Sequence, residues 1–368
     1  MDPRVAAALP PGRLERLRTW MEDERLDAAV LTGADEVNYL SGYLRYFGGP
    51  CALVVAGDGE RTLVVGPDEA KVAERLSDAD AVRCFGERGF GLELNPLPVL
   101  AGAVASVPAV ASATRLGVSG ALLDGRVGAQ LVPGGESLRR LRMRKDADEL
   151  TKILHAYELC WVGQQAVGDA AQSGEAREID LFTAAQAAAQ RAHGEPIEFL
   201  ADVLSGPMTA EVCGPVHVAS PRVAAPGQPV IADVVVRADG YAGDTAETHV
   251  VGSNPEAEAA RATLLEILAH TGAGLQPGAT GAEIFRRMKQ RIVDAFPGGE
   301  FPHHGGHALG LTSFEDPHII PSDDTPLEPG MVMAVEPGVY FPGRWGARVE
   351  NVFVVTAGGG VELREALA

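Results

Sequence analysis

The stretch "PVIADVVVRADGYAGDTAETHVVG", residues 229–252, decides how the second half of this chain folds. Two β-rich arms flank Asp239-Gly240, a pair typical of two-residue hairpin turns. In the register set by this turn, Val235 faces Asp244, and Asp233 lies on the same face as a diagonal neighbour about 7–8 Å from Asp244. Two carboxylates this close repel each other unless a cation or a proton lies between them. The alternative is that one of them points into solvent.

Three more chemically active residues follow in apolar or glycine-rich sequence. Glu336 ends the apolar strand "MVMAV", Glu350 lies inside the predicted strand "ARVENVFVV", and His307 lies in "GGHALG". A carboxylate inside an apolar strand needs a partner, because burying it alone is costly. For Glu350 that partner is either a cation or the side chain of Arg348. The glycines around His307 let its imidazole approach other groups closely.

These five residues form a set of oxygen ligands with one nitrogen ligand: Asp233, Asp244, His307, Glu336 and Glu350. Such a set suits paired divalent ions of the manganese, cobalt or zinc type. We therefore predict two divalent metal ions per chain, with manganese as the first candidate and cobalt or zinc as alternatives.

The length of 368 residues predicts two domains, with a boundary near Lys145, where a basic run leads into an amphipathic helix. For residues 1–145 the pattern predicts an α/β domain, with a helix from residue 13, a strand at residues 28–32 and a hairpin around residues 57–59. For residues 146–368 it predicts helices beside a largely antiparallel sheet, an α+β arrangement.

Composition excludes several classes of partner. The net charge of −19 repels nucleic-acid phosphates and anionic lipids, so neither nucleic acid nor a membrane surface is expected as a partner. No apolar run approaches the ~18 residues of a membrane span, and the first residues do not resemble an export signal. We expect a cytoplasmic protein. The four cysteines are far apart and form no CxxC pair, which argues against a disulfide framework and a thiolate zinc site.

The ordered set Asp233-x10-Asp244, "GGHALG", "MAVEPGVY" and "GARVEN" resembles the pita-bread metallopeptidases, which include prolidase, aminopeptidase P, methionine aminopeptidase and the related creatinase. The resemblance covers the whole chain, because the region with "NYLSGY" is similar to the creatinase-type N-terminal domain of prolidases. It implies an α+β pita-bread catalytic domain preceded by a creatinase-like α/β domain. It also implies that Asp244 and Glu350 bridge the two ions and that Glu336 acts on the nucleophilic water.

The same resemblance implies the activity and further site residues. The expected reaction is hydrolysis of the bond between an N-terminal residue and proline in small peptides, by an Xaa-Pro dipeptidase or aminopeptidase. His217 matches a histidine near the substrate carbonyl, with a core histidine as the alternative, and His303 matches a position that lines the substrate pocket. A homodimer is expected, in which one N-terminal domain covers the partner's active site. There Asp35 and Glu36, expected in a loop, are candidates for binding the substrate amine, or else are solvated charges.

Arg348 is the candidate for the carboxylate of a dipeptide substrate. Phe314 stands where the family pattern has a second histidine, seven residues after His307, and His318 is a possible replacement for it. His304 has no counterpart in the family and is expected to be exposed.

The segment after Asp244 also departs from the family pattern, since "DTAET" has Ala246 and Glu247 where the family has a hydroxyl residue and an arginine. These departures leave the ligands intact but put the substrate in doubt, because residues around a metal site tune it. Two alternatives therefore stay open. One is a metal-dependent hydrolase of a non-peptide C–N bond, and the other is a catalytically inactive binding protein with the same fold.

Overall fold

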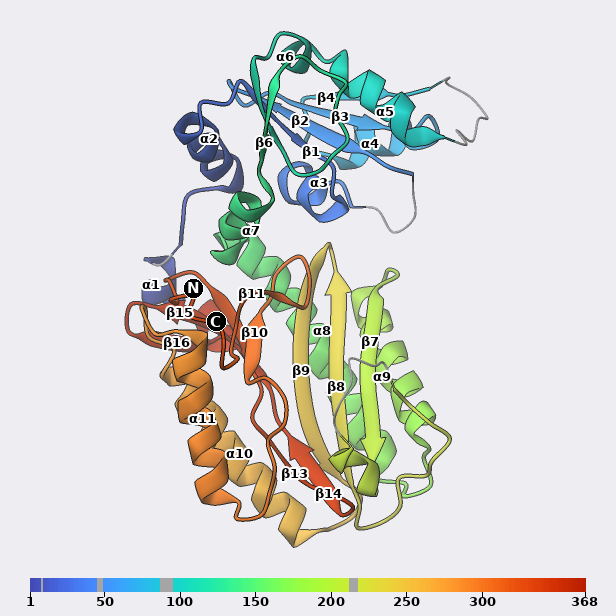
Figure 1. The fold of residues 1–368 in the computed structure, drawn as a ribbon. Coiled ribbons are helices and arrows are strands. Elements are labelled where there is room, and N and C mark those ends of the chain that lie inside the picture. The colour runs from blue at the N-terminus through green and yellow to red at the C-terminus, as the bar shows by residue number, and fades with distance from the viewer. Residues whose placement is uncertain (8, 45–48, 87–94, 212–217) are drawn as a thin grey trace. The chain divides into compact units, whose positions relative to one another are not determined.

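The computed structural model describes residues 1–368 except 8, 45–48, 87–94 and 212–217 (Figure 1). His217 therefore lies outside the described residues. The described chain forms two compact units, one of residues Pro11–Arg142 and one of Met1–Pro10 together with Met143–Ala368. Within the described ranges, we find no helix with the length and apolar composition needed to cross a membrane.

The Pro11–Arg142 unit is built on a six-stranded sheet in the order β4-β3-β2-β1-β5-β6. Its strands are β1 (Ala28–Leu31), β2 (Ala52–Ala56), β3 (Arg61–Val65), β4 (Ala81–Cys84), β5 (Arg115–Val118) and β6 (Gln130–Pro133). Its helices are α2 (Arg13–Asp23), α3 (Ala34–Ser41), α4 (Ala70–Leu76), α5 (Pro96–Ala105), α6 (Pro108–Ala111) and α7 (Gly135–Met143). The predicted first helix, first strand and β2–β3 hairpin are confirmed.

The first layer of the larger unit is an antiparallel sheet of β7 (Glu198–Ser205), β8 (Pro229–Ala238) and β9 (Tyr241–Val250), covered by α8 (Ala147–Ala171) and α9 (Glu178–His193) (Figure 1). Helix α8 begins at a capping box between Asp146 and Glu149, which satisfies free backbone N–H groups at its start. Alternate β8 residues, including Val234, pack against the two helices. Gly243 allows α8 to approach closely, since a Cβ there would lie 2.3 Å from the backbone N of Tyr157. Asp233 consequently lies on the opposite face of the sheet.

The hairpin register is the predicted one. Val235 pairs with Asp244, and Ala238 pairs with Tyr241. Both turn residues have positive φ, 51° for Asp239 and 79° for Gly240, as a tight hairpin of this type requires. Asp233 and Asp244 therefore share the face that α8 and α9 leave uncovered.

The second layer is a five-stranded antiparallel sheet in the order β11-β10-β12-β15-β16, with the separate ribbon β13–β14 beside it. The strands are β10 (Gly306–Ala308), β11 (Glu315–His318), β12 (Val332–Val335), β13 (Gly338–Phe341), β14 (Trp345–Arg348), β15 (Asn351–Thr356) and β16 (Gly359–Glu362). Apolar residues of this sheet pack against α10 (Pro255–Ala273) and α11 (Gly281–Ala295). Short helices α1 (Pro3–Ala6) and α12 (Leu363–Leu367) and a 3-10 turn at Gly206–Ala210 complete the unit. The α+β expectation is confirmed.

One predicted strand was wrong in its bounds. The segment "ARVENVFVV" is split into β14 and β15, and Glu350 lies in the break between them. The chain leaves the ladder here because the backbone N–H of Glu350 bonds to Ala246 O of β9, at 2.8 Å. This bond joins the two layers at the position of the predicted ligands.

Candidate metal centre

The candidate metal centre lies where β9 meets the second sheet. Besides the bond from Glu350 to Ala246, the N–H of Ala242 donates to Gly310 O at 2.7 Å. Asp244 lies between these two β9 positions, so its side chain is held against the second layer. Ligand atoms of Asp244, His307 and Glu350 lie within 4.8 Å of one another, and all three residues are buried.

His307 presents a nitrogen lone pair to carboxylates. Its Nδ1 is 3.1 Å from the carbonyl oxygen of Ala308, so Nδ1 carries the hydrogen and Nε2 is the unprotonated nitrogen of the neutral ring. Burial lowers the pKa of His307 to about 4, which keeps the ring neutral at physiological pH. Nε2 lies 3.8 Å from Asp244 Oδ2 and 3.7 Å from Glu336 Oε1. A lone pair beside two carboxylates is stable when a cation, or a proton, lies among them.

The carboxylates show the same need for a cation. Burial raises the pKa of Asp244 and of Glu350 well above the usual range, and their neighbouring carboxylates add to the rise. Within the part of the chain that the structure describes, Asp244 Oδ1 and Glu350 Oε1 are buried without a hydrogen-bond partner. Buried unpaired oxygens of this kind are rare and call for an explanation, such as a bound ion. This donor set fits divalent metal ions.

Asp233 has a cationic partner already. Arg348 Nη2 lies 2.9 Å from Asp233 Oδ2, and only 7% of the arginine side chain is exposed. Burial raises the pKa of Asp233 to about 6, although the positive charge of Arg348 opposes the rise. The alternative in which Arg348 forms the ion pair with Glu350 is therefore wrong in this structure. Strand β14 packs beside β8, which brings Arg348 to Asp233.

The environment of Glu336 contains a histidine that the sequence analysis placed wrongly. His304 was expected to be exposed, but its Nδ1 lies 2.9 Å from Glu336 Oε1, and its side chain is 31% exposed. The N–H of Glu336 donates to Gly305 O at 3.1 Å, which sets His304 beside the carboxylate. Burial raises the pKa of Glu336, but the contact with His304 and the positive charge that His304 carries when protonated outweigh burial and hold the pKa at about 2. Glu336 is therefore ionised.

His303 is fixed by bonds at both ring nitrogens. Its Nδ1 lies 2.6 Å from the carbonyl oxygen of His304, and its Nε2 lies 2.7 Å from the hydroxyl of Tyr340. Burial lowers the pKa of His303 to about 4. The neutral ring thus donates from Nδ1 and accepts from Tyr340 at Nε2. It also packs edge-on against Phe301, at a centroid distance of 4.7 Å.

Phe314 covers one face of His307. The two rings stack at a centroid distance of 4.1 Å and an angle of 27°, and Phe314 is 54% exposed. His318 pairs with His307 across the β10–β11 ladder, and its Nδ1 lies 3.6 Å from Asp316 Oδ1. At the position of the missing family histidine, the chain therefore has an apolar ring that covers one face of the His307 imidazole.

The remaining predicted site residues lie elsewhere. Asp35 and Glu36 occupy the first turn of α3, so the expectation of a loop was wrong; acidic residues are stabilised there by the helix dipole. They belong to the Pro11–Arg142 unit. Glu247 binds Arg261 of α10 with bonds of 2.6 and 2.7 Å, so this departure from the family pattern has its own partner.

Sequence reasoning missed one buried ion pair near the site. Lys145 Nζ lies 3.0 Å from Glu315 Oε2, and the two side chains are 1% and 4% exposed. Glu315 Oε1 also accepts the N–H of Leu311 at 3.1 Å, which closes the loop that carries Phe314. In the sequence, the only indication of this pair was Lys145 at the end of the basic run. Its partner Glu315 is 170 positions away, and no local pattern links the two residues.

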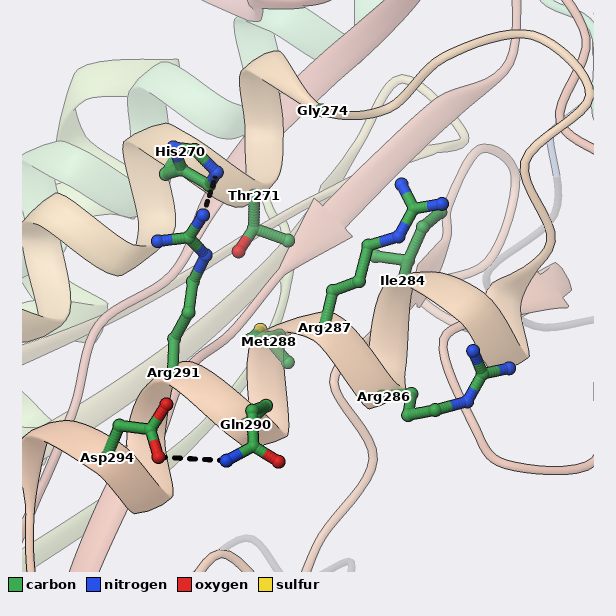
Figure 2. A pocket seen from close by; sticks show the side chains of 10 residues that line it. All are labelled: His270, Thr271, Gly274, Ile284, Arg286, Arg287, Met288, Gln290, Arg291 and Asp294. Atoms are coloured by element: carbon green, nitrogen blue, oxygen red, sulfur yellow. Dashed lines mark hydrogen bonds between the residues drawn. The ribbon is translucent and has the colours of Figure 1, made fainter.

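A separate pocket of about 560 Å³ lies between α10 and α11 (Figure 2). Its lining includes Arg286, Arg287 and Arg291, whose side chains point in different directions in Figure 2. None of the candidate metal ligands lines it, so we assign the pocket no part in the chemistry.

Comparison with known proteins gives the following relationships. Residues 13–144 match the creatinase/prolidase N-terminal domain, and residues 146–357 match metallopeptidase family M24. Over 229 residues the chain is 31% identical to a probable dipeptidase PepE of Mycobacterium tuberculosis, and this alignment spans 61% of the chain and 60% of that relative.

Two further matches cover nearly the whole length. The chain is 26% identical over 360 residues to the Xaa-Pro dipeptidase of Pyrococcus furiosus, with coverage of 95% of this chain and 97% of the relative. The crystal structure of dipeptidase PepE from Mycobacterium ulcerans has a TM-score of 0.74 and 27% identity, and covers 99% of this chain and 96% of its own.

Proposed function

Because the chain belongs to metallopeptidase family M24, as its motifs predicted, we propose that it is a dinuclear metal-dependent peptidase that cleaves between an N-terminal residue and proline. The observation that carries the proposal is the lone pair of His307 Nε2, which faces the carboxylates of Asp244 and Glu336 at 3.8 and 3.7 Å. The relative named Xaa-Pro dipeptidase, aligned over 97% of its length, supports the choice of substrate.

We assign the two metal ions to the ligands Asp233, Asp244, His307, Glu336 and Glu350, with manganese as the first candidate and cobalt or zinc as alternatives. The unpaired buried oxygens of Asp244 and Glu350 support this assignment. When bound, the ions would lower the pKa of a water molecule and polarise the scissile carbonyl. Asp233 enters the ligand set with one oxygen bound to Arg348, which orients the carboxylate.

Glu336 is the proposed proton carrier. The low pKa of Glu336 leaves it ionised at neutral pH, so it has a free oxygen to receive a proton from the attacking water, which bound metal ions would make more acidic. It then returns this proton to the leaving nitrogen. His303, held between Tyr340 and the backbone of His304, lines the pocket as a neutral ring. We propose His217 as the group that stabilises the oxyanion, on the strength of its sequence context alone.

We propose a small peptide as substrate and a homodimer as the assembly, in the cytoplasm. Arg348, Phe314 and His318 are proposed to contact the substrate, together with Asp35 and Glu36 of a partner subunit. Residues 1–145 and 146–368 are the proposed domains, and the matched ranges 13–144 and 146–357 support this division.

The test is an assay of metal-stripped protein reloaded with manganese, cobalt or zinc, against an Xaa-Pro dipeptide, a longer Xaa-Pro peptide and an Xaa-Ala dipeptide. We expect hydrolysis of Xaa-Pro substrates that depends on added metal. Equal rates on Xaa-Ala and Xaa-Pro would replace the proline-specific proposal with a general dipeptidase. The measured metal content of the same samples tests the dinuclear assignment separately.

One observation favours a second function. Phe314 replaces a polar residue with an exposed ring stacked on His307, which removes a proton donor from the expected pocket. A metal-dependent hydrolase of a non-peptide C–N bond is therefore the second candidate. It predicts a full complement of metal with no turnover of any of the three peptides. An inactive binding protein is disfavoured because the chain has kept all five ligand residues.

A further inference from the structure

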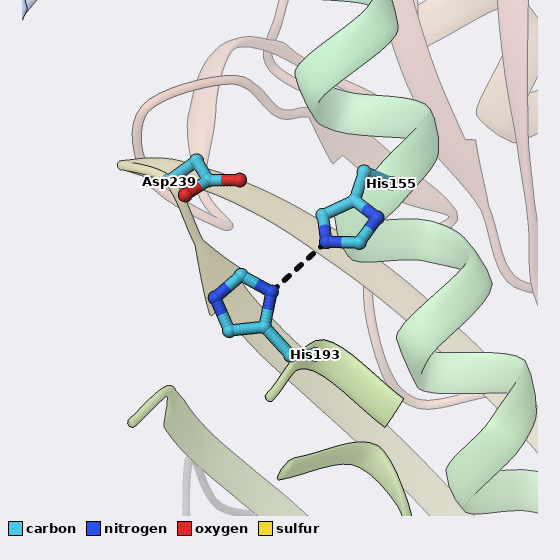
Figure 3. Close-up of side chains that lie close together, drawn as sticks. All are labelled: His155, His193 and Asp239. Carbon is cyan, nitrogen blue, oxygen red and sulfur yellow. Dashed lines mark hydrogen bonds between the residues drawn. The ribbon is translucent and has the colours of Figure 1, made fainter. Parts of the chain in front are cut away.

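The turn of the β8–β9 hairpin lies beside two histidines that the proposed active site does not use (Figure 3). His155 lies on α8, His193 is the last residue of α9, and Asp239 is in the hairpin turn. One ligand atom of each residue lies within 4.8 Å of the other two. We propose that these three residues bind a divalent transition-metal ion, of the zinc or nickel kind, at a second site separate from the candidate metal centre.

The geometry of the two rings is close to that of a shared ion. His155 Nε2 lies 2.9 Å from His193 Nδ1, so one nitrogen donates a hydrogen and the other accepts it (Figure 3). In a tetrahedral zinc site with Zn–N bonds of about 2.0–2.1 Å, two ligand nitrogens lie about 3.3 Å apart. If His155 Nε2 and His193 Nδ1 moved apart by a few tenths of an ångström, a zinc ion could therefore bind between them in place of the shared hydrogen. Asp239 supplies a third ligand, and water completes the coordination.

The surroundings favour a cation that prefers nitrogen ligands. The cluster lies at the carboxyl end of α9, where the helix dipole stabilises positive charge. His155 and Asp239 are exposed and His193 is half-buried, so an ion reaches the site from solvent. Two imidazoles with one carboxylate select zinc, nickel, copper or cobalt over magnesium, calcium or manganese. The candidate metal centre differs, because it has four carboxylates and one imidazole.

A bound ion would tie three elements together. The histidines come from the two helices that cover the first sheet, and Asp239 comes from the turn of the hairpin whose arms carry Asp233 and Asp244. An ion that binds only the folded state stabilises it in proportion to its occupancy. Zinc should therefore raise the melting temperature through this cluster.

The test is equilibrium dialysis of the full-length protein against zinc, followed by metal analysis of wild type, His155→Ala, His193→Ala and the control His270→Ala. His270 is an exposed histidine on α10 that contacts Arg291 and lies outside the cluster. The candidate metal centre is unchanged in all four proteins, so any zinc bound there contributes equally to each measured zinc content and does not affect the differences between them. Wild type and His270→Ala should bind one more zinc ion than the other two, and zinc should raise their melting temperature further. Equal zinc content in all four would overturn the proposal.

A milder variant keeps the test decisive if an alanine variant does not fold. Asp239 has a φ of 51°, a conformation that asparagine also adopts, so Asp239→Asn should preserve the turn. We expect its melting temperature without zinc to equal that of wild type and its zinc affinity to be lower. Unchanged affinity, or no anomalous scattering peak between His155 and His193 in zinc-soaked crystals, would show that the histidines form only a hydrogen bond.

Discussion

Breaking the ion pair between Lys145 and Glu315 should destabilise the protein strongly. Both side chains are almost completely buried, at 1% and 4% exposure, so removal of the Glu315 carboxylate would leave the ammonium of Lys145 buried without this counter-ion. The variant Glu315→Gln leaves the ammonium of Lys145 in this position and also weakens the bond to Leu311. Loss of one partner of a buried pair typically costs about 3–5 kcal/mol in the free energy of unfolding.

The double variant Lys145→Met/Glu315→Gln separates the effect of the unpaired charge from that of lost packing. It contains neither charge, and methionine fills much of the volume of the lysine chain. We expect it to recover most of the loss and to lie within about 1–2 kcal/mol of wild type. The exposed pair Arg344 and Glu256 supplies the control, since Glu256→Gln should change stability by less than about 1 kcal/mol.

The assay is urea unfolding of all four proteins, with fluorescence and circular dichroism recorded together so that separate unfolding of the two units is detected. A cost below about 1 kcal/mol for Glu315→Gln would refute the reasoning. So would a double variant that is no more stable than Glu315→Gln, because the unpaired charge would then not be the cause.

Three further predictions concern the metal centre and the sheet beneath it. Glu336→Gln should lower kcat by about 10²–10⁴-fold while Glu256→Gln leaves it unchanged; near-normal turnover would place the base elsewhere. Asp244→Asn should stabilise the metal-free protein in thermal unfolding but remove the stabilisation that metal gives. The difference in melting temperature between Asp244→Asn and wild type should grow as pH rises. The reason is that burial raises the pKa of Asp244 in the folded protein, so wild type loses stability as pH rises through that pKa, whereas the asparagine variant does not. A difference in melting temperature that stays constant with pH would contradict this. Gly243→Ala should cost about 1–3 kcal/mol or more by collision with the α8 backbone, whereas Gly128→Ala, at an exposed position with open space around it, should be close to neutral.

The hairpin was predictable because its determinants are local. Asp239-Gly240 fixes the turn, the turn fixes the register, and the register puts Asp233 and Asp244 on one face. The helices of the larger unit follow equally from local spacing and caps. The five candidate ligands were predicted from their residue types in apolar or glycine-rich sequence, and from the resemblance of the surrounding motifs to those of a known family.

The details that sequence reasoning missed depend on long-range contacts. His304 meets Glu336 because the backbone of Glu336 bonds to Gly305, and Lys145 meets Glu315 across 170 positions. The guanidinium of Arg348 had two acidic candidates in reach, and packing of β14 beside β8 selected Asp233. No local pattern distinguishes such partners, since the choice is made when the two layers pack.

The backbone hydrogen bonds from Ala242 to Gly310 and from Glu350 to Ala246 join the two layers of the larger unit, and the candidate metal centre lies where these layers, here called its halves, meet. The half that contains α8, α9 and the hairpin supplies two carboxylates, and the half that contains α10, α11 and the second sheet supplies the remaining ligands. Neither half alone contains all five candidate ligands, so metal binding at this centre would require the two halves to pack together, and part of the binding energy would be the energy of that packing. A metal ion bound at this centre would therefore stabilise the packing of the two halves against each other.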